Sequence, residues 1–121
     1  MLQVTSNSTI YLASKHIDFR KGIDGIVSIC RNIINVEPLD GAIFVFYNRH
    51  MTSLKILNYD GQGFWLCTKR LSRGSFIWKS QLNKRDCNNR NATIICYRIL
   101  HVLINNGNLD VTFASNWRNL K

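Results

Sequence analysis

The sequence predicts a single α+β domain, in which a small antiparallel β-meander of three or four strands packs with an N-terminal and a C-terminal helix. Two observations lead to this prediction. Apolar residues recur at helical spacing near both ends of the chain, and strand-like runs separated by short turns lie between them. A chain of 121 residues, 45% of them hydrophobic, can build one hydrophobic core but not two. We therefore expect residues 1–121 to form one domain.

The N-terminal part is predicted to form a brief strand followed by a helix. Residues 10–12 are a short apolar run flanked by polar residues, which is typical of a strand. From about Phe19 to Ile34, apolar residues follow the i, i+3, i+4, i+7 spacing of one helical face, and Asp18 is a suitable N-cap. Pro38 prevents the helix from continuing, because proline lacks an N–H group.

The centre of the chain predicts the meander. Residues 42–47 are an unbroken apolar run typical of a strand buried on both faces, and residues 54–59 alternate between two faces. Phe64 to Leu71 returns as a third strand. The connections are short: residues 48–53 are polar, and the Asp-Gly-Gln-Gly sequence at 60–63 suits a tight hairpin turn. These three strands should therefore be antiparallel neighbours.

A second helix is predicted near the C-terminus. Helical spacing of apolar residues resumes at Ile94 and runs to Leu103, with Asn91 or Thr93 as the N-cap. Asn106-Gly107 is a stop signal. The tail, residues 112–121, has no clear periodicity and carries no prediction of structure.

Positive charge is concentrated in one part of the chain. The sequence has 16 Lys and Arg against 7 Asp and Glu, a net charge of +9. Nine of the cations and only two of the acids lie between Gly41 and Arg90, so this segment carries most of the net charge. Such a field favours nucleic acid or another acidic partner. The alternative is a protein that is basic without having such a partner.

Cations and aromatic residues interleave between residues 58 and 79. Lys69 and Arg70 fall at the end of the third meander strand, where Lys55 of the neighbouring strand can join them. This pattern fits a surface that contacts phosphates and stacks on bases or sugars. In the alternative interpretation the aromatic residues fill the core and the cations form a solvated rim. The other residues concerned are Phe64, Trp65, Arg73, Phe76, Trp78 and Lys79.

No motif for catalysis or cofactor binding is present, and we expect neither an enzyme nor a cofactor. The four cysteines contain no CxxC pair and the three histidines are scattered, which favours free thiols over a metal site. Three of the seven acidic residues could converge on a divalent ion, as a nuclease requires. However, Asp18, Asp24, Asp40 and Asp60 all have places at predicted helix starts or turns.

The first nine residues contain neither a basic leader nor an apolar segment. No stretch approaches the roughly 20 apolar residues that a membrane-spanning helix needs. We therefore expect a soluble, cytoplasmic protein without membrane contacts.

Five motifs occur in the order and near the spacing of one known family. They are FRKGIDG at 19–25, GAIFVFYNR at 41–49, LKIL at 54–57, YDGQGFWL at 59–66 and KRLSRGSFIW at 69–78. The chain resembles the TnpB accessory protein, which is encoded by the second open reading frame of transposons in the insertion sequence 66 family. The resemblance covers about residues 10–110.

The resemblance implies a small bacterial protein, carried by a mobile element beside a larger transposase that holds the catalytic acids. The motif cations of the family correspond to Arg20, Lys21, Arg49, Lys55, Lys69, Arg70 and Arg73, and Lys79 replaces a usual Pro. We expect a non-enzymatic accessory factor that binds DNA through these eight cations. The alternative is a protein-interaction subunit that docks on the transposase without contacting DNA. The expected partners are DNA, the transposase and other proteins of the same mobile element.

Overall fold

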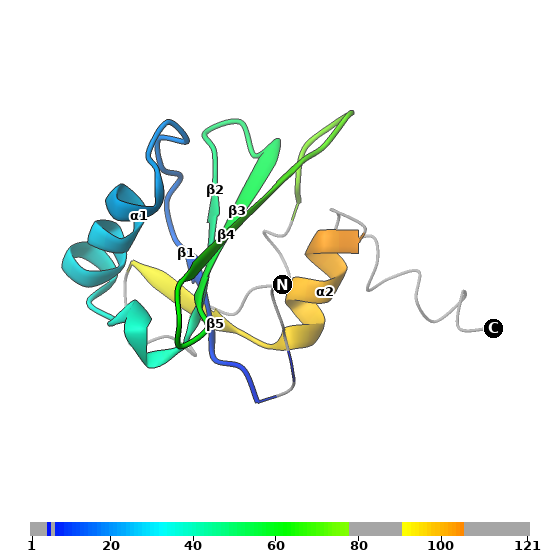
Figure 1. The fold of residues 1–121 in the computed structure, drawn as a ribbon. Coiled ribbons are helices and arrows are strands. Elements are labelled where there is room, and N and C mark those ends of the chain that lie inside the picture. The colour runs from blue at the N-terminus through cyan, green and yellow to red at the C-terminus, as the bar shows by residue number, and fades with distance from the viewer. Residues whose placement is uncertain (1–4, 6, 78–90, 106–121) are drawn as a thin grey trace.

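The computed structural model describes Thr5, residues 7–77 and residues 91–105. They form a five-stranded mixed sheet with a helix on each side (Figure 1). The elements are β1 (Ile10–Ala13), α1 (Ile23–Ile29), β2 (Ile43–Tyr47), β3 (Ser53–Tyr59), β4 (Phe64–Arg70), β5 (Ala92–Ile95) and α2 (Tyr97–Asn105). The predicted α+β class is confirmed.

The meander of β2, β3 and β4 is confirmed. Tyr47 pairs with Leu54 across the first hairpin, and Tyr59 pairs with Phe64 across the second. In the second turn, the carboxylate of Asp60 accepts hydrogen bonds from two backbone N–H groups at 2.9 Å. Gly61 supplies the left-handed backbone that the turn requires, with φ of 95°.

The sheet differs from the prediction in strand number and direction. Its order is β4-β3-β2-β1-β5, and β1 runs parallel to β2 while all other neighbours are antiparallel. The expectation of a purely antiparallel sheet of three or four strands is therefore wrong. The cause is the helical crossover between β1 and β2, because such a connection returns the chain in the same direction.

The first helix begins later than predicted, at Ile23 instead of Phe19. Asp18 is not its N-cap, since the Asp18 carboxylate accepts the N–H of Arg20 at 2.9 Å and closes a turn of its own. Gly22 occupies the N-cap position without a side-chain hydrogen bond. The helix continues as a π-helical turn, Cys30–Ile34, and ends before Pro38 as expected.

The C-terminal apolar pattern contains a strand and a helix. Residues 92–95 form β5, which pairs with β1 along the edge of the sheet, and α2 begins only at Tyr97. The predicted helix start at Ile94, with Asn91 or Thr93 as the cap, is therefore wrong. The N–H groups of Ile99 and Leu100 bond to the carbonyl of Cys96, which makes Cys96 the residue that precedes the helix.

The helices cover opposite faces of the sheet (Figure 1). Since paired residues of neighbouring strands share a face, Phe44 and Leu57 lie on one face and Val45 and Ile56 on the other. All four are buried, which explains the continuous apolar run of β2. Among the described helices, none is long and apolar enough to cross a membrane.

Candidate nucleic-acid interface

Three connections meet at one end of the sheet. Because β1 and β2 are parallel, the loop after β1 lies beside the turn after β2, where β3 begins and β4 ends (Figure 1). Backbone hydrogen bonds join them: the N–H of Ile17 bonds to Tyr47 at 3.0 Å, and that of Leu71 bonds to Thr52 at 2.9 Å. We call residues 14–22, 48–52 and 70–75 together the basic end.

The basic end has a strong excess of positive charge. Its cations are Lys15, Arg20, Lys21, Arg49, Arg70 and Arg73, all of them exposed. Asp18 is the one acidic residue within these three segments, and Asp24 follows in the first turn of α1. The other described acids, Glu37, Asp40 and Asp60, lie before β2 or after β3, at the opposite end of the sheet. In the described part of the chain, exposed cations therefore gather at one end of the strands and three of the five acidic residues lie at the other end.

The turn that carries Arg49 is held by the side chain of Asn48. Its amide oxygen accepts the N–H groups of Thr52 and Ser53 at 2.8 and 3.1 Å, and its amide nitrogen donates to the Thr52 hydroxyl at 2.8 Å. Met51 adopts a left-handed backbone, with φ of 57°. This network fixes the turn, so Arg49 projects from a defined backbone.

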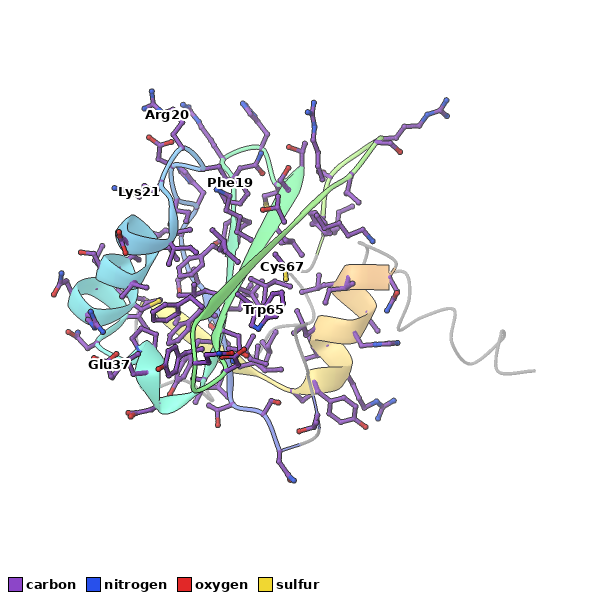
Figure 2. All side chains as sticks on the ribbon, viewed as in Figure 1. Phe19, Arg20, Lys21, Glu37, Trp65 and Cys67 are labelled. Atoms are coloured by element: carbon purple, nitrogen blue, oxygen red, sulfur yellow. The ribbon has the colours of Figure 1, made fainter. Side chains whose placement is uncertain are left out.

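The loop that carries Arg20 and Lys21 is held by Lys55 on β3. The Lys55 ammonium donates to the carbonyl of Phe19 at 2.7 Å and to that of Lys21 at 3.3 Å, and it lies 5.0 Å from the centre of the Phe19 ring. Lys55 is half-buried. Lys55 therefore holds the loop, while Arg20 and Lys21 project outward from it (Figure 2). A contact of Lys55 with phosphate stays a prediction.

Arg20 forms an ion pair with Asp18. The guanidinium Nε lies 3.1 Å from both carboxylate oxygens, and Nη2 lies 2.8 Å from one of them. The hydrogen bonds from the Arg20 side chain and backbone lower the pKa of Asp18 to about 2. The pair stays accessible, since 91% of the Arg20 side chain is exposed.

A cleft separates the loop from the turn within the basic end. Its volume is about 550 Å³. It is lined by His16, Ile17, Asp18, Phe19 and Arg20 on one side and by Asn48, Arg49 and His50 on the other. Arg20, Arg49 and two histidines thus line one hollow, although they come from two segments that are 28 or more residues apart in the sequence. The arrangement offers several donors to an anion.

The remaining predicted cations are not all at this surface. Lys69 lies opposite Leu54 on the face toward α2, and its ammonium donates to the carbonyl of Ile104 in the last turn of that helix. Lys55 lies opposite Thr68, on the other face of the sheet. Lys55 and Lys69 therefore do not form one group. Lys79 lies outside the described residues, as do Lys84, Arg85 and Arg90.

Lys15, His16 and His50 belong to this surface, but they were not among the predicted site residues. They lie in loops of unremarkable composition, and only the parallel pairing of β1 with β2 brings those loops together. One sequence signal could have predicted their place. A strand, a helix and a second buried strand in succession indicate two parallel strands, whose C-terminal ends lie at the same end of the sheet.

The aromatic residues between positions 58 and 79 were expected either to fill the core or to form a surface that stacks on bases. Phe76 is buried, with 2% exposed, and its N–H bonds to Met51 at 2.7 Å. Trp65 is 40% exposed, but it lies near the opposite end and donates to the Asp60 carboxylate at 2.8 Å. Trp78 lies outside the described residues. Phe76 and Trp65 therefore do not accompany the cations as a stacking surface.

Three of the described carboxylates, those of Asp18, Glu37 and Asp60, have local structural partners. Asp60 caps its turn, and Glu37 pairs with Arg31 at 2.9 Å while accepting the N–H of Leu39 at 3.0 Å. Hydrogen bonds from Arg31 and from the turn lower the pKa values of Glu37 and Asp60 respectively. Within the part of the chain that the structure describes, no group of three acidic, His or Cys side chains lies close enough to hold a metal ion.

Comparison with known proteins places the chain in a family. Residues 8–101 match the IS66 Orf2 like protein family (TnpB_IS66). Two similar proteins come from Sinorhizobium fredii: the uncharacterized protein y4hO is 40% identical over 66% of this chain and 70% of its own length. The uncharacterized protein y4jC is 36% identical over 57% of this chain and 59% of its own length. No solved structure matches. The chain therefore belongs to the family of IS66 Orf2-like proteins, as its five ordered motifs predicted.

Proposed function

We propose that the protein is a non-enzymatic accessory factor for transposition of a bacterial insertion sequence, and that it binds the DNA backbone through the basic end. Family membership implies the accessory role. The observation that supports DNA binding is that six exposed cations from three connections lie at one end of the sheet. An accessory factor that meets DNA in this way acts in the bacterial cytoplasm.

The chemistry of the basic end favours phosphate contacts over base reading. Lys and Arg side chains bind phosphate oxygens and release condensed counterions, which gives affinity without sequence information. The supports of the loop and the turn, Lys55 and Asn48, reduce the freedom that the cations lose on binding. We therefore expect salt-sensitive binding with little preference for sequence.

A pair of matched double variants tests this function. Arg49→Ala/Arg70→Ala removes two cations from the basic end, whereas Arg31→Ala/Arg98→Ala removes two exposed cations elsewhere and changes the net charge equally. Binding to a fluorescent 20-base-pair duplex is measured by anisotropy at several salt concentrations. We expect the first variant to lose at least about tenfold in affinity at low salt and the second less than about threefold. Equal losses in both variants would contradict a localised interface, and no binding of the wild type at low salt would contradict DNA binding.

The second candidate function is docking on the transposase of the same element. It is favoured by large apolar side chains that remain exposed on the described surface: Ile33 at 51%, Ile94 at 48%, Leu39 at 47% and Tyr97 at 41%. Docking through such side chains should persist at 0.5 M salt, where phosphate contacts are largely screened. Co-purification of the co-encoded transposase at low and high salt, with wild type and Ile33→Ser/Ile94→Ser, distinguishes the two surfaces.

A further inference from the structure

The carboxylate of Asp18 occupies the guanidinium fork of Arg20 in the unbound protein. It contacts Nε and Nη2 of Arg20, with its nearest oxygen 2.8 Å from Nη2, and it also accepts the Arg20 backbone N–H at 2.9 Å. The Asp18 side chain is itself 44% exposed. The two residues therefore form a local, exposed ion pair, and the Arg20 side chain points away from the sheet (Figure 2).

Asp18 is also the one acidic residue that lines the cleft of the basic end. The opposite wall carries Arg49 and His50, and His16 stands on the same wall as Asp18. Asp18 thus lines the same hollow as Arg20, Arg49 and the two histidines. An anion that entered the cleft would meet Arg49 directly but would find one face of Arg20 already occupied.

A carboxylate and a phosphate present the same pattern to a guanidinium, namely two oxygens that accept parallel N–H donors. An exposed ion pair is weak in water, because solvent and salt screen it. A phosphate that is also held by Arg49 can therefore replace the carboxylate on Arg20 without a large conformational change. The Asp18 turn can persist during this exchange, since its bond to the Arg20 backbone does not involve the guanidinium.

We propose that this cleft binds one backbone phosphate of duplex DNA, and that the phosphate displaces Asp18 from the guanidinium of Arg20. This inference rests on the proposed function, and it adds the position of one phosphate and the group that competes with it. Asp18 then weakens binding to DNA and keeps Arg20 oriented while DNA is absent. Removal of its charge should raise affinity for DNA beyond what the change in net charge explains.

The chain offers a matched control. Arg31 and Glu37 form an exposed pair of the same kind, with distances of 2.9 and 3.1 Å, but Glu37 lies near the opposite end of the molecule (Figure 2). Asp18→Asn and Glu37→Gln each remove one negative charge, so both raise the net charge of the protein by one. Each new amide oxygen can still accept the backbone N–H that the carboxylate accepts, so both variants keep their turns.

The test measures binding of both variants and the wild type to a blunt duplex without terminal phosphates, over a series of salt concentrations. We expect Asp18→Asn to bind about three- to tenfold more tightly than the wild type, with a similar slope of log K against log salt, since the same phosphates are neutralised in both proteins. Glu37→Gln should stay within about twofold of the wild type. In an Arg20→Ala background, the gain from Asp18→Asn should fall to that of Glu37→Gln.

The outcomes separate this inference from the function on which it rests. If the wild type binds DNA but Asp18→Asn binds no better than Glu37→Gln, the displacement of Asp18 is wrong and DNA binding stands. If the gain from Asp18→Asn survives in the Arg20→Ala background, the phosphate does not use Arg20 and the inference is also wrong. If no variant binds DNA at low salt, both the inference and the proposed function fail. Circular dichroism and unfolding of each variant check that the fold is retained.

Discussion

At the scale of single residues, Lys55 connects the sheet to the loop that presents Arg20 and Lys21. Its ammonium bonds to the carbonyls of Phe19 and Lys21. Replacement by Met keeps the apolar stem and removes the charged donor. We expect Lys55→Met to lower the free energy of unfolding by about 1.5–3 kcal/mol, the range for hydrogen bonds to charged groups.

Urea unfolding checks this prediction, with Arg49→Met as the control. Arg49 is exposed, so its replacement should change the free energy of unfolding by less than about 0.5 kcal/mol. Similar values for both variants would show that the Lys55 ammonium does not support the loop.

The Asp18–Arg20 pair predicts a specific response to acid. The pKa of Asp18 in the folded protein, about 2, lies below the value of about 3.9 for an unfolded chain. A lowered folded pKa means that the stabilisation is present above pH 4 and is lost as the pH falls toward 2. The wild type should therefore be more stable than Asp18→Asn at pH 5, and the difference should disappear near pH 2. Urea unfolding of both proteins across this range measures it, and a constant difference would contradict the assignment.

At the scale of elements, β5 is the clearest case in which neighbouring strands override a local pattern. Ile95 is buried, with 4% exposed, whereas Ile94 is 48% exposed, as the alternation of a strand requires. We expect Ile95→Ala to cost about 2–5 kcal/mol of unfolding free energy and Ile94→Ala less than about 1 kcal/mol. Thermal and urea unfolding of the two variants test this, and equal costs would argue against the strand.

A short apolar run does not distinguish a strand from a helix, because both bury such residues. Ile94 and Ile95 continued the spacing of the following helix, so the sequence suggested one element where there are two. The decisive partner is the open edge of β1, which is 79 or more residues away in the sequence. Local periodicity carries no information about such a partner.

The start of α1 shows the same limit on a smaller scale. Asp18 is a residue that often caps helices, but its carboxylate can also close a turn with the N–H two residues later. Here the turn wins, and the helix begins after Gly22. This difference matters for the proposed function, because residues 19–22, which were predicted to be helical, lie instead in the loop of the basic end.

At the scale of the whole molecule, the separation of charge predicts how binding responds to salt. The basic end presents six exposed cations, of which a straight duplex can meet only some at once. With about 0.9 counterion released per phosphate, we expect a slope of log K against log salt between about −3 and −5. Arg49→Ala/Arg70→Ala should bring it about 1.8 closer to zero. A slope near zero in the wild type would instead favour the transposase as the primary partner.

The sequence by itself determined the class of the fold, the β2-β3-β4 meander, the concentration of charge and the family. These properties follow from local patterns: alternation in the strands, the Asp-Gly turn at Asp60 and the five ordered motifs. Each can be read within a segment of about ten to twenty residues, where spacing and turn chemistry dominate.

Only the tertiary structure decided which cations share a surface. The parallel pairing of β1 with β2 brings the loop of Arg20 and the turn of Arg49 to one cleft. The strand register places Lys69 on the face toward α2 and Lys55 on the other face, where it bonds to the loop. The physical reason is that successive side chains along a strand point to opposite faces of the sheet, and that strand direction decides which loops lie at the same end. Both depend on contacts between distant segments, which no single stretch of the chain specifies.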